Sequence, residues 1–418
     1  MAKHEDNTQQ NVPTIRQKLQ QQVFQHAYQH TVNPYSKAVF GQLARCHTAQ
    51  QGMHQLRFSD SSCGQVQLQY HNCGNRHCPN CGGMRRQQWL DDKTSELLPT
   101  AYYHVVFTLP HELNSLIMGN RKVLFRLLLE ASSYTLLKLA KDKKWLGAKP
   151  DIISILHTWG QQLSFHPHVH CIVSGGGVQE DAKGQPEQWI PEKRRNRSFL
   201  FPAPLLKKVY KTYYLQQVKR LLQQDKLQTT DKAATMAMLA DISRKRWNVY
   251  AKKPFGGPSQ VLEYLGRYTH KVAITAHRIK AISSSSNTIT FTYKDYHKRN
   301  TKEEQQQMTI PIAEFIRRLE QHILPRGFVK IRHYGYLRNH KRSERLQLLF
   351  RLMKQPPPPP KVQVPVSQRM LEQYGKDIGQ CPQCGAGRLD LVATYHRGVL
   401  TQTYETAMET TVRNKAPG

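Results

Sequence analysis

The spacing of apolar side chains along the chain predicts both strands and helices. Residues 101–110 form an aromatic and β-branched run that Pro110 ends, which is typical of a buried strand. Residues 152–159 and 168–174 are two further strand candidates, with a short polar turn between them. Alternation over 272–296 predicts a hairpin with its loop at Ser283 to Asn287. Helical spacing predicts helices at 119–142, 203–225, 232–248 and 308–323, and another from a Ser259 N-cap to about Thr269.

The charge balance indicates what such a fold binds. Across 418 residues, 61 Lys and Arg stand against 29 Asp and Glu, a formal net charge of +32. An excess of this size acts on partners rather than on the fold, and nucleic acid is the usual acidic partner. A basic ribosome-like or membrane-surface protein is the alternative. We expect DNA as the partner, with no membrane and no small-molecule substrate.

The ends and the cysteines indicate the compartment. No apolar run is long enough to cross a bilayer, and the Gln-rich start has no apolar signal-peptide core. We therefore expect a cytoplasmic protein. The eight cysteines lie mostly in tight pairs beside histidines, which in a reducing compartment favours metal binding over disulfides.

The strand at 168–174 begins with a histidine pattern. His168 and His170 lie on one face of the strand, because side chains alternate with period two. Two neutral imidazoles so placed can chelate one divalent ion. His166 shares that face in register, although Pro167 can bend the chain there. Imidazole ligands accept Mn²⁺ or another transition ion, and Mg²⁺ with help from phosphate oxygens.

A third ligand has to come from elsewhere. If 152–159 and 168–174 pair as an antiparallel hairpin turning near Gln162 and Leu163, His157 lies opposite His168. His157 is therefore the predicted third ligand, with Gln161 as the substitute. The alternative is a set of surface or core histidines that hold no metal.

The helix after Ser259 carries Tyr264 and Tyr268 at i and i+4, so both stand on one face. A phenol oxygen can attack a phosphodiester and form a covalent phosphotyrosine. Arg267, His270 and Lys271 flank this face and could contact phosphate. Core packing or stacking is the ordinary alternative for tyrosines at this spacing.

The cysteine-rich region has zinc spacing. Cys78-Pro79-Asn80-Cys81 is a knuckle, and Cys63, Cys73, Cys78 and Cys81 would complete a tetrahedral Zn²⁺ site. The other candidate ligands are His77, His71, His54 and Cys46. A closed site of four ligands would be structural, and arginines beside it would face DNA; these are Arg76, Arg85 and Arg86. Reduced cysteines in a core are the alternative.

The remaining cysteines are less telling. Cys381 and Cys384 form a second knuckle without an obvious partner pair, and they either join unused N-terminal ligands or bind nothing. Cys171 follows the histidine pattern and points to the opposite face, so we expect it in the core.

The stretch 330–354 is rich in Lys and Arg, and Arg332 is a candidate DNA contact. Tyr334 and Tyr336 could stack on unpaired bases. A solvated basic face is the alternative. The five prolines from Pro356 to Pro360 predict a stiff extended spacer before the tail.

Taken in order, these motifs resemble the IS91 family of bacterial rolling-circle transposases. The matching strings lie between about residues 40 and 345; they are Tyr70 to Cys81, Tyr103 to Pro110, Leu156 to Gly160, His166 to His170, Tyr264 to His270, and Ile331 to Gly335. One position departs from the family, which commonly has a cysteine where this chain has Asp60.

The resemblance implies an α+β fold. Its HUH-type nuclease core would be a central antiparallel sheet flanked by helices, with a small zinc-binding domain before it. His168 and His170 would hold Mg²⁺ or Mn²⁺, and Tyr264 and Tyr268 would be the nucleophiles. The protein would be bacterial and nucleoid-associated.

The motifs and the resemblance together divide the chain into five parts. They are an N-terminal flexible or helical segment (1–40), a zinc-binding DNA-recognition domain (41–95), a nuclease domain (96–300) with a helical insertion at about 203–250, a basic helical DNA-binding region (301–354), and a proline-rich linker and tail (355–418).

The expected function is a transposase that nicks single-stranded DNA at an element end, forms a 5′-phosphotyrosine and leaves a 3′-OH. A plasmid replication initiator or relaxase would use the same chemistry, although a zinc region ahead of the nuclease core argues against it. A non-catalytic zinc regulator that binds DNA is the third hypothesis, and it gives Tyr264, Tyr268 and His168 no role.

Overall fold

The structure is a computed structural model of the whole chain. The residues that it describes are 14–59, 65–81, 83–192, 200–251, 255, 260–261, 264, 266, 272–295, 304–338, 341–358, 360–361, 364–381, 384–385 and 388–404. Several predicted site residues lie outside these ranges; they are Cys63, Arg267, Tyr268, His270 and Lys271.

The chain forms two compact units, and neither is continuous in sequence. The first unit combines Met1–Gly82, Ile274–Ile316 and Gln363–Gly418. The second combines Gly83–Ala273 with Arg317–Val362. Both units mix strands and helices, so the fold is α+β, as predicted.

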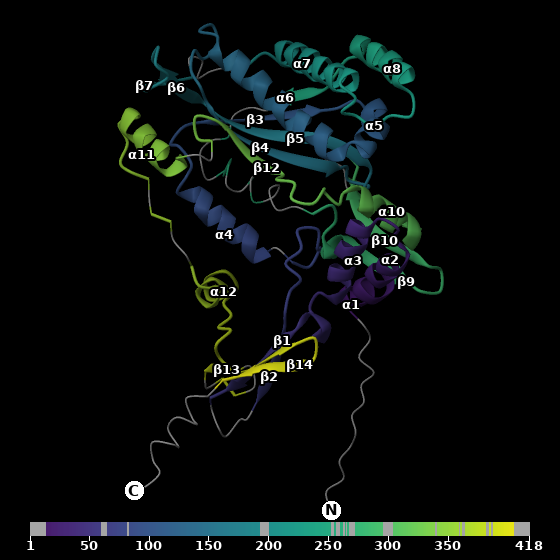
Figure 1. The fold of residues 1–418 in the computed structure, drawn as a ribbon. Helices are drawn as coiled ribbons and strands as arrows, with labels where there is room; N and C mark the ends of the chain where they lie inside the picture. Colours follow the sequence, from purple (N-terminus) through teal and green to yellow (C-terminus); the bar gives the residue numbers. More distant parts are fainter. Residues whose placement is uncertain are drawn as a thin grey trace, which may run out of the picture. The chain divides into compact units, whose positions relative to one another are not determined.

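A five-stranded antiparallel sheet is the centre of the second unit, in the order β12-β4-β5-β3-β8 (Figure 1). The strands are β3 (Tyr102–Thr108), β4 (Asp151–Trp159), β5 (Phe165–Ser174), β8 (Val249–Ala251) and β12 (Ile331–Gly335). The predicted strands at 101–110, 152–159 and 168–174 are confirmed, and the last of them begins earlier than predicted. A separate hairpin, β6 (Gly176–Glu180) and β7 (Pro186–Pro191), follows the sheet's middle strand.

Helices cover one face of this sheet and pack on every second residue of its strands. They are α5 (Asn114–Gly119), α6 (Arg121–Lys141), α7 (Ala203–Gln223) and α8 (Lys232–Arg244), and η3 (His111–Leu113) precedes them. Phe107, Val169 and Cys171 are buried in this core, so the core position predicted for Cys171 is confirmed. The helix predicted at 232–248 ends at Arg244, and residues 249–251 form a strand that pairs with β3.

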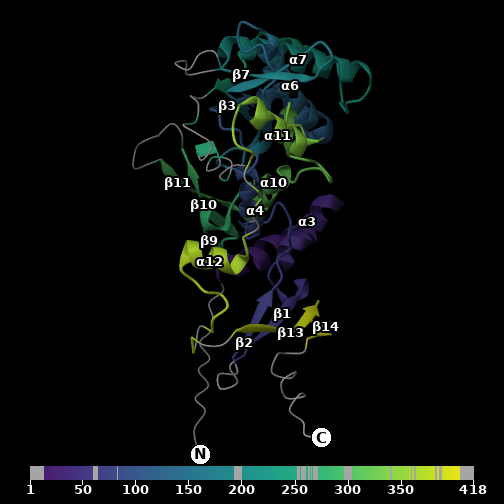
Figure 2. The ribbon, with the colours of Figure 1, turned by 90° about the vertical axis from the view of Figure 1, so that its left-hand side faces the viewer.

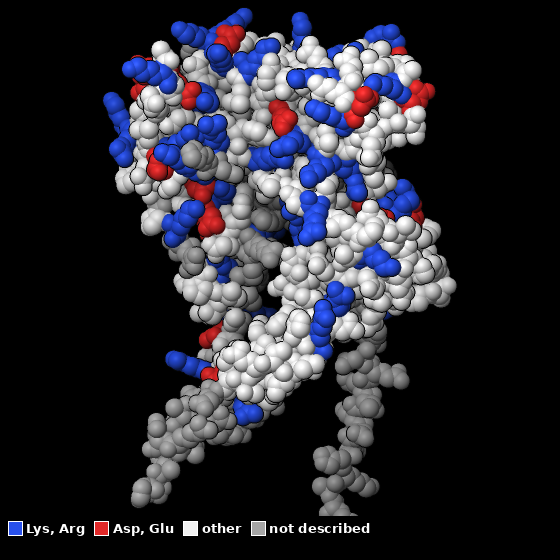
Figure 3. All heavy atoms as spheres, viewed as in Figure 1, with Lys and Arg blue, Asp and Glu red and all other residues white. Residues whose placement is uncertain are grey.

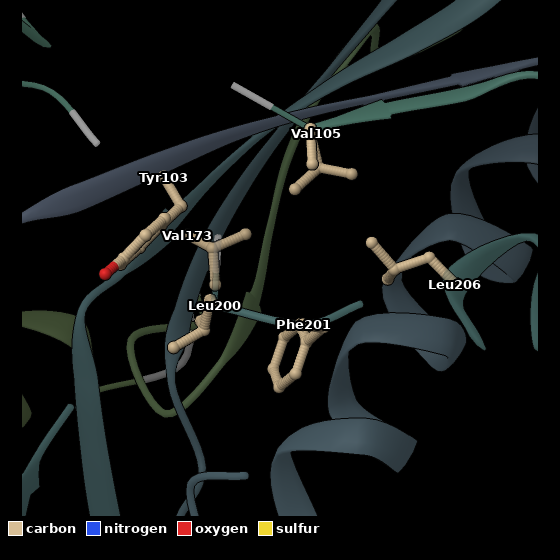
Figure 4. Close-up of a pocket in the computed structure, with 7 residues that line it drawn as sticks. Tyr103, Val105, Val173, Leu200, Phe201 and Leu206 are labelled. Atoms are coloured by element: carbon tan, nitrogen blue, oxygen red, sulfur yellow. The ribbon is translucent and has the colours of Figure 1, made fainter. Parts of the chain in front are cut away.

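The core on this face is nearly filled. Figure 4 shows side chains around a small cavity between the sheet and α7, among them Val105, Val173 and Leu206. The cavity holds about 10 Å³ and is lined by apolar groups apart from the phenol of Tyr103. A space of that size is at the lower limit for one water molecule, so it is a packing gap and not a ligand site.

The opposite face of the sheet carries the histidines. Its core includes Ile153, Ile155 and Ile172 of the sheet, with Leu346 and Leu349 of α11 (Arg342–Leu352). α4 (Gly83–Thr94) packs against the same core through Trp89 and Leu90. Among the described residues of the segment predicted as a helix after Ser259, positions 260, 261, 264 and 266 are helical.

Gly335 closes β12 at a point where a side chain cannot fit. Its φ is +82°, and a Cβ there would stand 1.8 Å from the carbonyl oxygen of Pro150. Gly335 is also paired with Asp151 in the sheet. Only glycine allows the chain to pass this close to the start of β4.

The first unit holds two sheets. One has the order β14-β13-β1-β2, and the other has the order β11-β10-β9. Their strands are β1 (Met53–Phe58), β2 (Val66–Tyr70), β13 (Leu389–His396), β14 (Val399–Thr403), β9 (Ile279–Ser283), β10 (Thr288–Lys294) and β11 (Gln305–Pro311). The predicted hairpin within 272–296 is confirmed by the pairing of β9 with β10, and these two strands and β11 lie side by side in Figure 2.

The helices of this unit are short. They are α1 (Ile15–Lys18), the π-helical η1 (Leu19–Phe24), α2 (Gln25–His30), α3 (Pro34–Arg45), η2 (Ala49–Gln51), η4 (Ala276–Arg278) and α12 (Val366–Tyr374). α10 (Ile312–Gln321) contains the boundary between the two units. Among the described helices, none is both long and apolar enough to cross a bilayer.

Two segments differ from the sequence prediction. The region 301–354 was expected to be helical, yet residues 305–311 form β11 and residues 331–335 form β12. In β11 the exposed positions alternate with more buried ones, and it pairs with β10 along its whole length. β12 is held by main-chain pairing with β4, which leaves little trace in the side-chain pattern. The helix predicted at 308–323 therefore begins only at Ile312.

The tail also has more structure than a linker. β13 pairs with β1, although more than 300 residues separate the two strands. The C-terminal segment is thereby part of the same sheet as β1 and β2, the two strands that lie between Cys46 and Cys73 in the sequence.

Candidate catalytic and metal sites

Three histidines meet on the face of the β4–β5 hairpin opposite the one that α6 covers. His157 of β4 is paired directly with His168 of β5, as predicted, and His170 follows on the same face. One ligand atom from each of the three lies within 4.8 Å of the others. His157 and His170 are buried, and His168 is partly exposed. His166 is exposed and is not one of the three converging histidines. Gln161 lies in the turn after β4.

Neighbouring groups orient these imidazoles. Nδ1 of His168 lies 2.6 Å from the main-chain oxygen of His166, so this nitrogen donates its hydrogen there. The Nε2 atom of His168 is therefore its ligand atom. His157 stacks on Trp159, with ring centroids 4.9 Å apart and planes at 19°. Three converging imidazoles, one of them oriented by a main-chain oxygen, suit a divalent transition ion.

Tyr264 contacts this histidine group. Its phenol oxygen lies 2.9 Å from Nδ1 of His170 and 2.7 Å from Nε2 of His104. The side chain is 9% exposed and belongs to the core beneath α4 and α11. A nucleophile that acts together with a metal ion has to lie beside the metal ligands. The Tyr264 hydroxyl does so, because it contacts His170.

His104 was not among the residues predicted from the sequence. It lies two residues before Val106, which is paired with His170, so it shares the histidine face of the sheet. The alternation of side chains along the strand predicted at 101–110 already placed His104 on one face of that strand. Only the pairing of β3 with β5 shows that this face is also the face of His170.

A glycine allows the Tyr264 segment to lie close to α4. A Cβ on Gly266 would stand 2.9 Å from Cδ1 of Leu90. The small residue two positions after Tyr264 therefore lets this segment pack tightly on α4. Tyr268, Arg267, His270 and Lys271 lie outside the described residues.

The candidate DNA contacts in the basic stretch have different surroundings. Arg332 lies with its guanidinium 5.4 Å from the centre of the Phe328 ring, and it is partly exposed. Tyr336 is buried in the core under α11, so it cannot stack on a base without leaving that core. Tyr334 is partly buried and packs against the core on the α6 side.

Four cysteines converge in the first unit, and they differ from the favoured set in one member. Cys46, Cys73, Cys78 and Cys81 have all their sulfur atoms within 4.8 Å of one another. Cys46 caps the C-terminus of α3, and the other three follow β2. Sequence reasoning placed Cys46 only among the alternatives, and Cys63 lies outside the described residues. His77 is not a member of the cluster.

The sulfur atoms are close enough to share one ion. The Sγ atom of Cys46 lies 3.1 Å from that of Cys81 and 3.7 Å from that of Cys78. Hydrogen bonds from Cys46, Cys73 and Cys78 lower the pKa of the Cys81 thiol. Four thiol donors of this kind are the donor set of a closed structural zinc site.

The other candidate zinc ligands are placed elsewhere. His54 and His71 contact each other, with ring centroids 4.3 Å apart, and neither belongs to the four-cysteine cluster. Cys381 is buried and Cys384 is exposed, and neither is in this cluster. Arg76 follows Cys73 in the chain and keeps its place as a candidate DNA contact.

A buried charge cluster lies at the far end of β4 from the histidines. The carboxylate of Glu96 pairs with Lys93, with Arg342 at 2.9 Å and with Lys361 at 3.1 Å. Burial raises the pKa of Glu96, but the positive charges of Lys93 and Arg342 outweigh it and bring the pKa to about 2. Burial raises the pKa of Asp151 to about 6.

Comparisons with known proteins point in one direction. Residues 15–109 match the family described as "Transposase zinc-binding domain", and residues 152–344 match the family described as "Putative transposase". The chain is 37% identical over 372 residues to a protein of Sinorhizobium fredii named "Putative transposase y4qJ", covering 86% of this chain and 90% of that one. It is 28% identical over 346 residues to the "Transposase for insertion sequence element IS801" of Pseudomonas savastanoi, covering 82% and 80%. No solved structure matches the chain.

Proposed function

Because this chain belongs to the IS91 family of transposases and carries the family's zinc-binding domain, we propose that it cuts and rejoins single-stranded DNA through a 5′-phosphotyrosine. The proposed reaction moves an insertion sequence by a rolling-circle route. A transposase cuts DNA, so the chain is an enzyme that acts on DNA. The observation that carries the finer proposal is the contact of the Tyr264 hydroxyl with His170.

The chemistry needs no further reactant. The phenol oxygen of Tyr264 attacks the scissile phosphorus, so a bond forms between this oxygen and phosphorus while the bond to the 3′ oxygen breaks. The phenol loses its proton, and the departing 3′ oxygen gains one and leaves as a hydroxyl. Rejoining is the reverse attack by a 3′-OH on the phosphotyrosine, which has kept the energy of the original bond.

The histidine group would hold the divalent ion. His157, His168 and His170 would supply three imidazole nitrogens to Mg²⁺ or Mn²⁺, which when bound polarises the scissile phosphate. The protein's own part is orientation. The main-chain oxygen of His166 fixes the ring of His168. Trp159 confines the ring of His157.

A second tyrosine would form the second covalent intermediate in the transfer of a DNA strand. Tyr268, four residues after Tyr264, permits two successive covalent intermediates without the release of a DNA end. Arg267, His270 and Lys271 would contact the phosphates beside it. The cysteine cluster would hold Zn²⁺ as a structural ion, with Arg76 near the DNA.

The positive charge of the protein supports binding along a single DNA strand. Figure 3 shows one face of the molecule, on which Lys and Arg side chains outnumber those of Asp and Glu, in keeping with the net charge of +32. Arg332 is the proposed phosphate contact on β12. Binding should weaken steeply as salt is raised, because phosphate contacts release counterions.

The test is a covalent adduct. Purified full-length protein is mixed with a single-stranded oligonucleotide of the element end, labelled at its 3′ end, in Mg²⁺ or Mn²⁺. A 5′-phosphotyrosine should carry the label with the protein through denaturing gel electrophoresis, and the released fragment should end in a 3′-OH that a polymerase extends.

The matched variants decide the role of the tyrosines. The double variant Tyr264→Phe/Tyr268→Phe should give no adduct. Tyr374→Phe changes an exposed tyrosine of α12 and should behave as the wild type. If the double variant and the wild type give the same amount of adduct, the proposed nucleophiles are wrong.

A further inference from the structure

His104 is a buried histidine outside the group that would hold the metal. It lies in the middle of β3, is 2% exposed, and is not one of the three histidines whose ligand atoms converge. A histidine so deeply buried in a sheet requires an explanation, because a polar ring is costly to bury unless its nitrogens are bonded.

The nitrogen Nε2 of His104 is part of a triangle of polar atoms. It lies 2.7 Å from the phenol oxygen of Tyr264 and 3.0 Å from Nδ1 of His170. The third side, from Tyr264 to His170, is 2.9 Å. One phenol oxygen is therefore held between two imidazoles from neighbouring strands.

The direction of the hydrogens follows from the role of His170. If His170 offers Nε2 to the metal, its Nδ1 carries the hydrogen and donates it to the phenol oxygen. The hydroxyl hydrogen of Tyr264 then points at Nε2 of His104, which accepts it. The phenol is thus oriented by one donor and one acceptor.

Packing fixes the His104 ring as well. It is parallel to the ring of His170, with planes at 3° and centroids 5.2 Å apart. The ring of Tyr264 lies 4.5 Å away, and that of Phe255 lies 6.4 Å away. Phe255 is tied to β3 by a hydrogen bond from its main-chain nitrogen to the oxygen of Tyr102. His104 has little room to turn away from the phenol.

We propose that His104 is a positioning residue that holds the phenol oxygen of Tyr264 against the metal-binding histidine His170. The inference rests on the proposed function and extends it to a residue that takes no part in metal binding. A nucleophile fixed in advance reacts faster than one that has to be ordered during the reaction, and small displacements can cost on the order of 10²-fold in rate. The loss should appear in the rate of adduct formation and not in DNA binding.

Three variants test this. His104→Phe keeps a planar ring and removes the acceptor. His104→Gln places an amide oxygen near the position of Nε2, whereas the amide of His104→Asn reaches only as far as Nδ1. Single-turnover adduct formation is measured at saturating Mn²⁺ and DNA, with DNA affinity and Mn²⁺ affinity measured in parallel.

We expect His104→Phe and His104→Asn to lose roughly 10²-fold in rate. His104→Gln should recover most of that loss, while DNA and Mn²⁺ affinities stay near wild type. In a Tyr264→Phe background, any adduct formed through Tyr268 should be indifferent to His104→Phe, because the hydrogen bond is already absent.

The outcomes separate the two proposals. If the wild type forms no adduct, the proposed function fails and the role of His104 fails with it. If the wild type forms the adduct and His104→Phe forms it at the same rate, only the role of His104 is overturned. If His104→Phe does not fold, equal rates for His104→Gln and His104→Asn overturn it.

Discussion

His157 lies directly opposite His168 in the antiparallel ladder that β4 forms with β5. The two ring centroids are 5.5 Å apart, and the ring of His157 lies 4.6 Å from that of His170. A slip of one residue in this pairing would turn His157 to the face that α6 covers. The register of one hairpin therefore decides whether a third imidazole reaches the other two.

The first prediction concerns that third imidazole. His157→Ala should weaken Mn²⁺ binding by about 10- to 100-fold, since even supporting residues of metal sites have effects of that size. Adduct formation should fall with it. Mn²⁺ affinity is measured by electron paramagnetic resonance titration of the purified protein.

Two neighbours serve as controls for His157. Gln161→Ala removes the residue that the sequence offered as a substitute ligand. His166→Ala removes an exposed ring but keeps the main-chain oxygen that orients His168. Both should bind Mn²⁺ nearly as the wild type does. A loss of affinity in Gln161→Ala equal to that in His157→Ala would mean that the third ligand has been misassigned.

The second prediction concerns the fourth zinc ligand. Cys46→Ser should lower the zinc content of the purified protein, because it removes one sulfur from the cluster of Cys46, Cys73, Cys78 and Cys81. Cys63→Ser should keep the zinc of this cluster. Zinc is measured by mass spectrometry of the metal and by its release to a colorimetric chelator. Retention of zinc by Cys46→Ser and its loss from Cys63→Ser would restore the ligand set favoured by the sequence.

The zinc site shows where sequence reasoning stops. The knuckle at Cys78 and Cys81 is a local pattern, and the sequence identified it. The choice between Cys46 and Cys63 depends on how the chain folds back after α3, which spacing alone does not determine. The structure brings Cys46 to the knuckle across 32 residues.

The sheets, too, were predicted where neighbouring segments pair and missed where distant segments pair. Alternation and the short turn predicted the β4–β5 hairpin and its register. The pairings of β12 with β4 and of β13 with β1 were missed, because main-chain hydrogen bonds between distant segments leave no periodic signal. His104 was missed for a related reason, since its place beside His170 depends on the pairing of β3 with β5.

The third prediction tests the end of β12. Gly335→Ala should lower the free energy of unfolding by about 3 to 5 kcal/mol, because a Cβ would meet the oxygen of Pro150 and the positive φ would be strained. Gly327 is the matched control, with a φ of +72° and open space around it. Gly327→Ala should cost only about 1 kcal/mol. Chemical denaturation measures the free energy of unfolding of both variants. Equal decreases would show that the backbone of β12 shifts to accommodate the added Cβ atom.

The last prediction concerns acid stability and rests on Glu96 and Asp151, whose pKa values move in opposite directions. The pKa of Glu96 is depressed to about 2 from an ordinary value of 4.5. Its contribution to stability is therefore fully present above pH 4.5 and is lost as the pH falls toward 2. Glu96→Gln should be less stable than the wild type by about 3 kcal/mol at pH 7 and should match it near pH 2.

Asp151 should show the opposite pH dependence. Burial raises its pKa to about 6 from 3.8, so its neutral form favours folding, and that contribution is lost as the pH rises through 6. Asp151→Asn should therefore equal the wild type below pH 4 and exceed its stability at pH 8. Denaturation midpoints measured from pH 2 to pH 8 give the curves of both variants. If Asp151→Asn is instead the less stable protein at pH 8, its neighbours stabilise the ionised Asp151 carboxylate and the pKa of that group is lowered rather than raised.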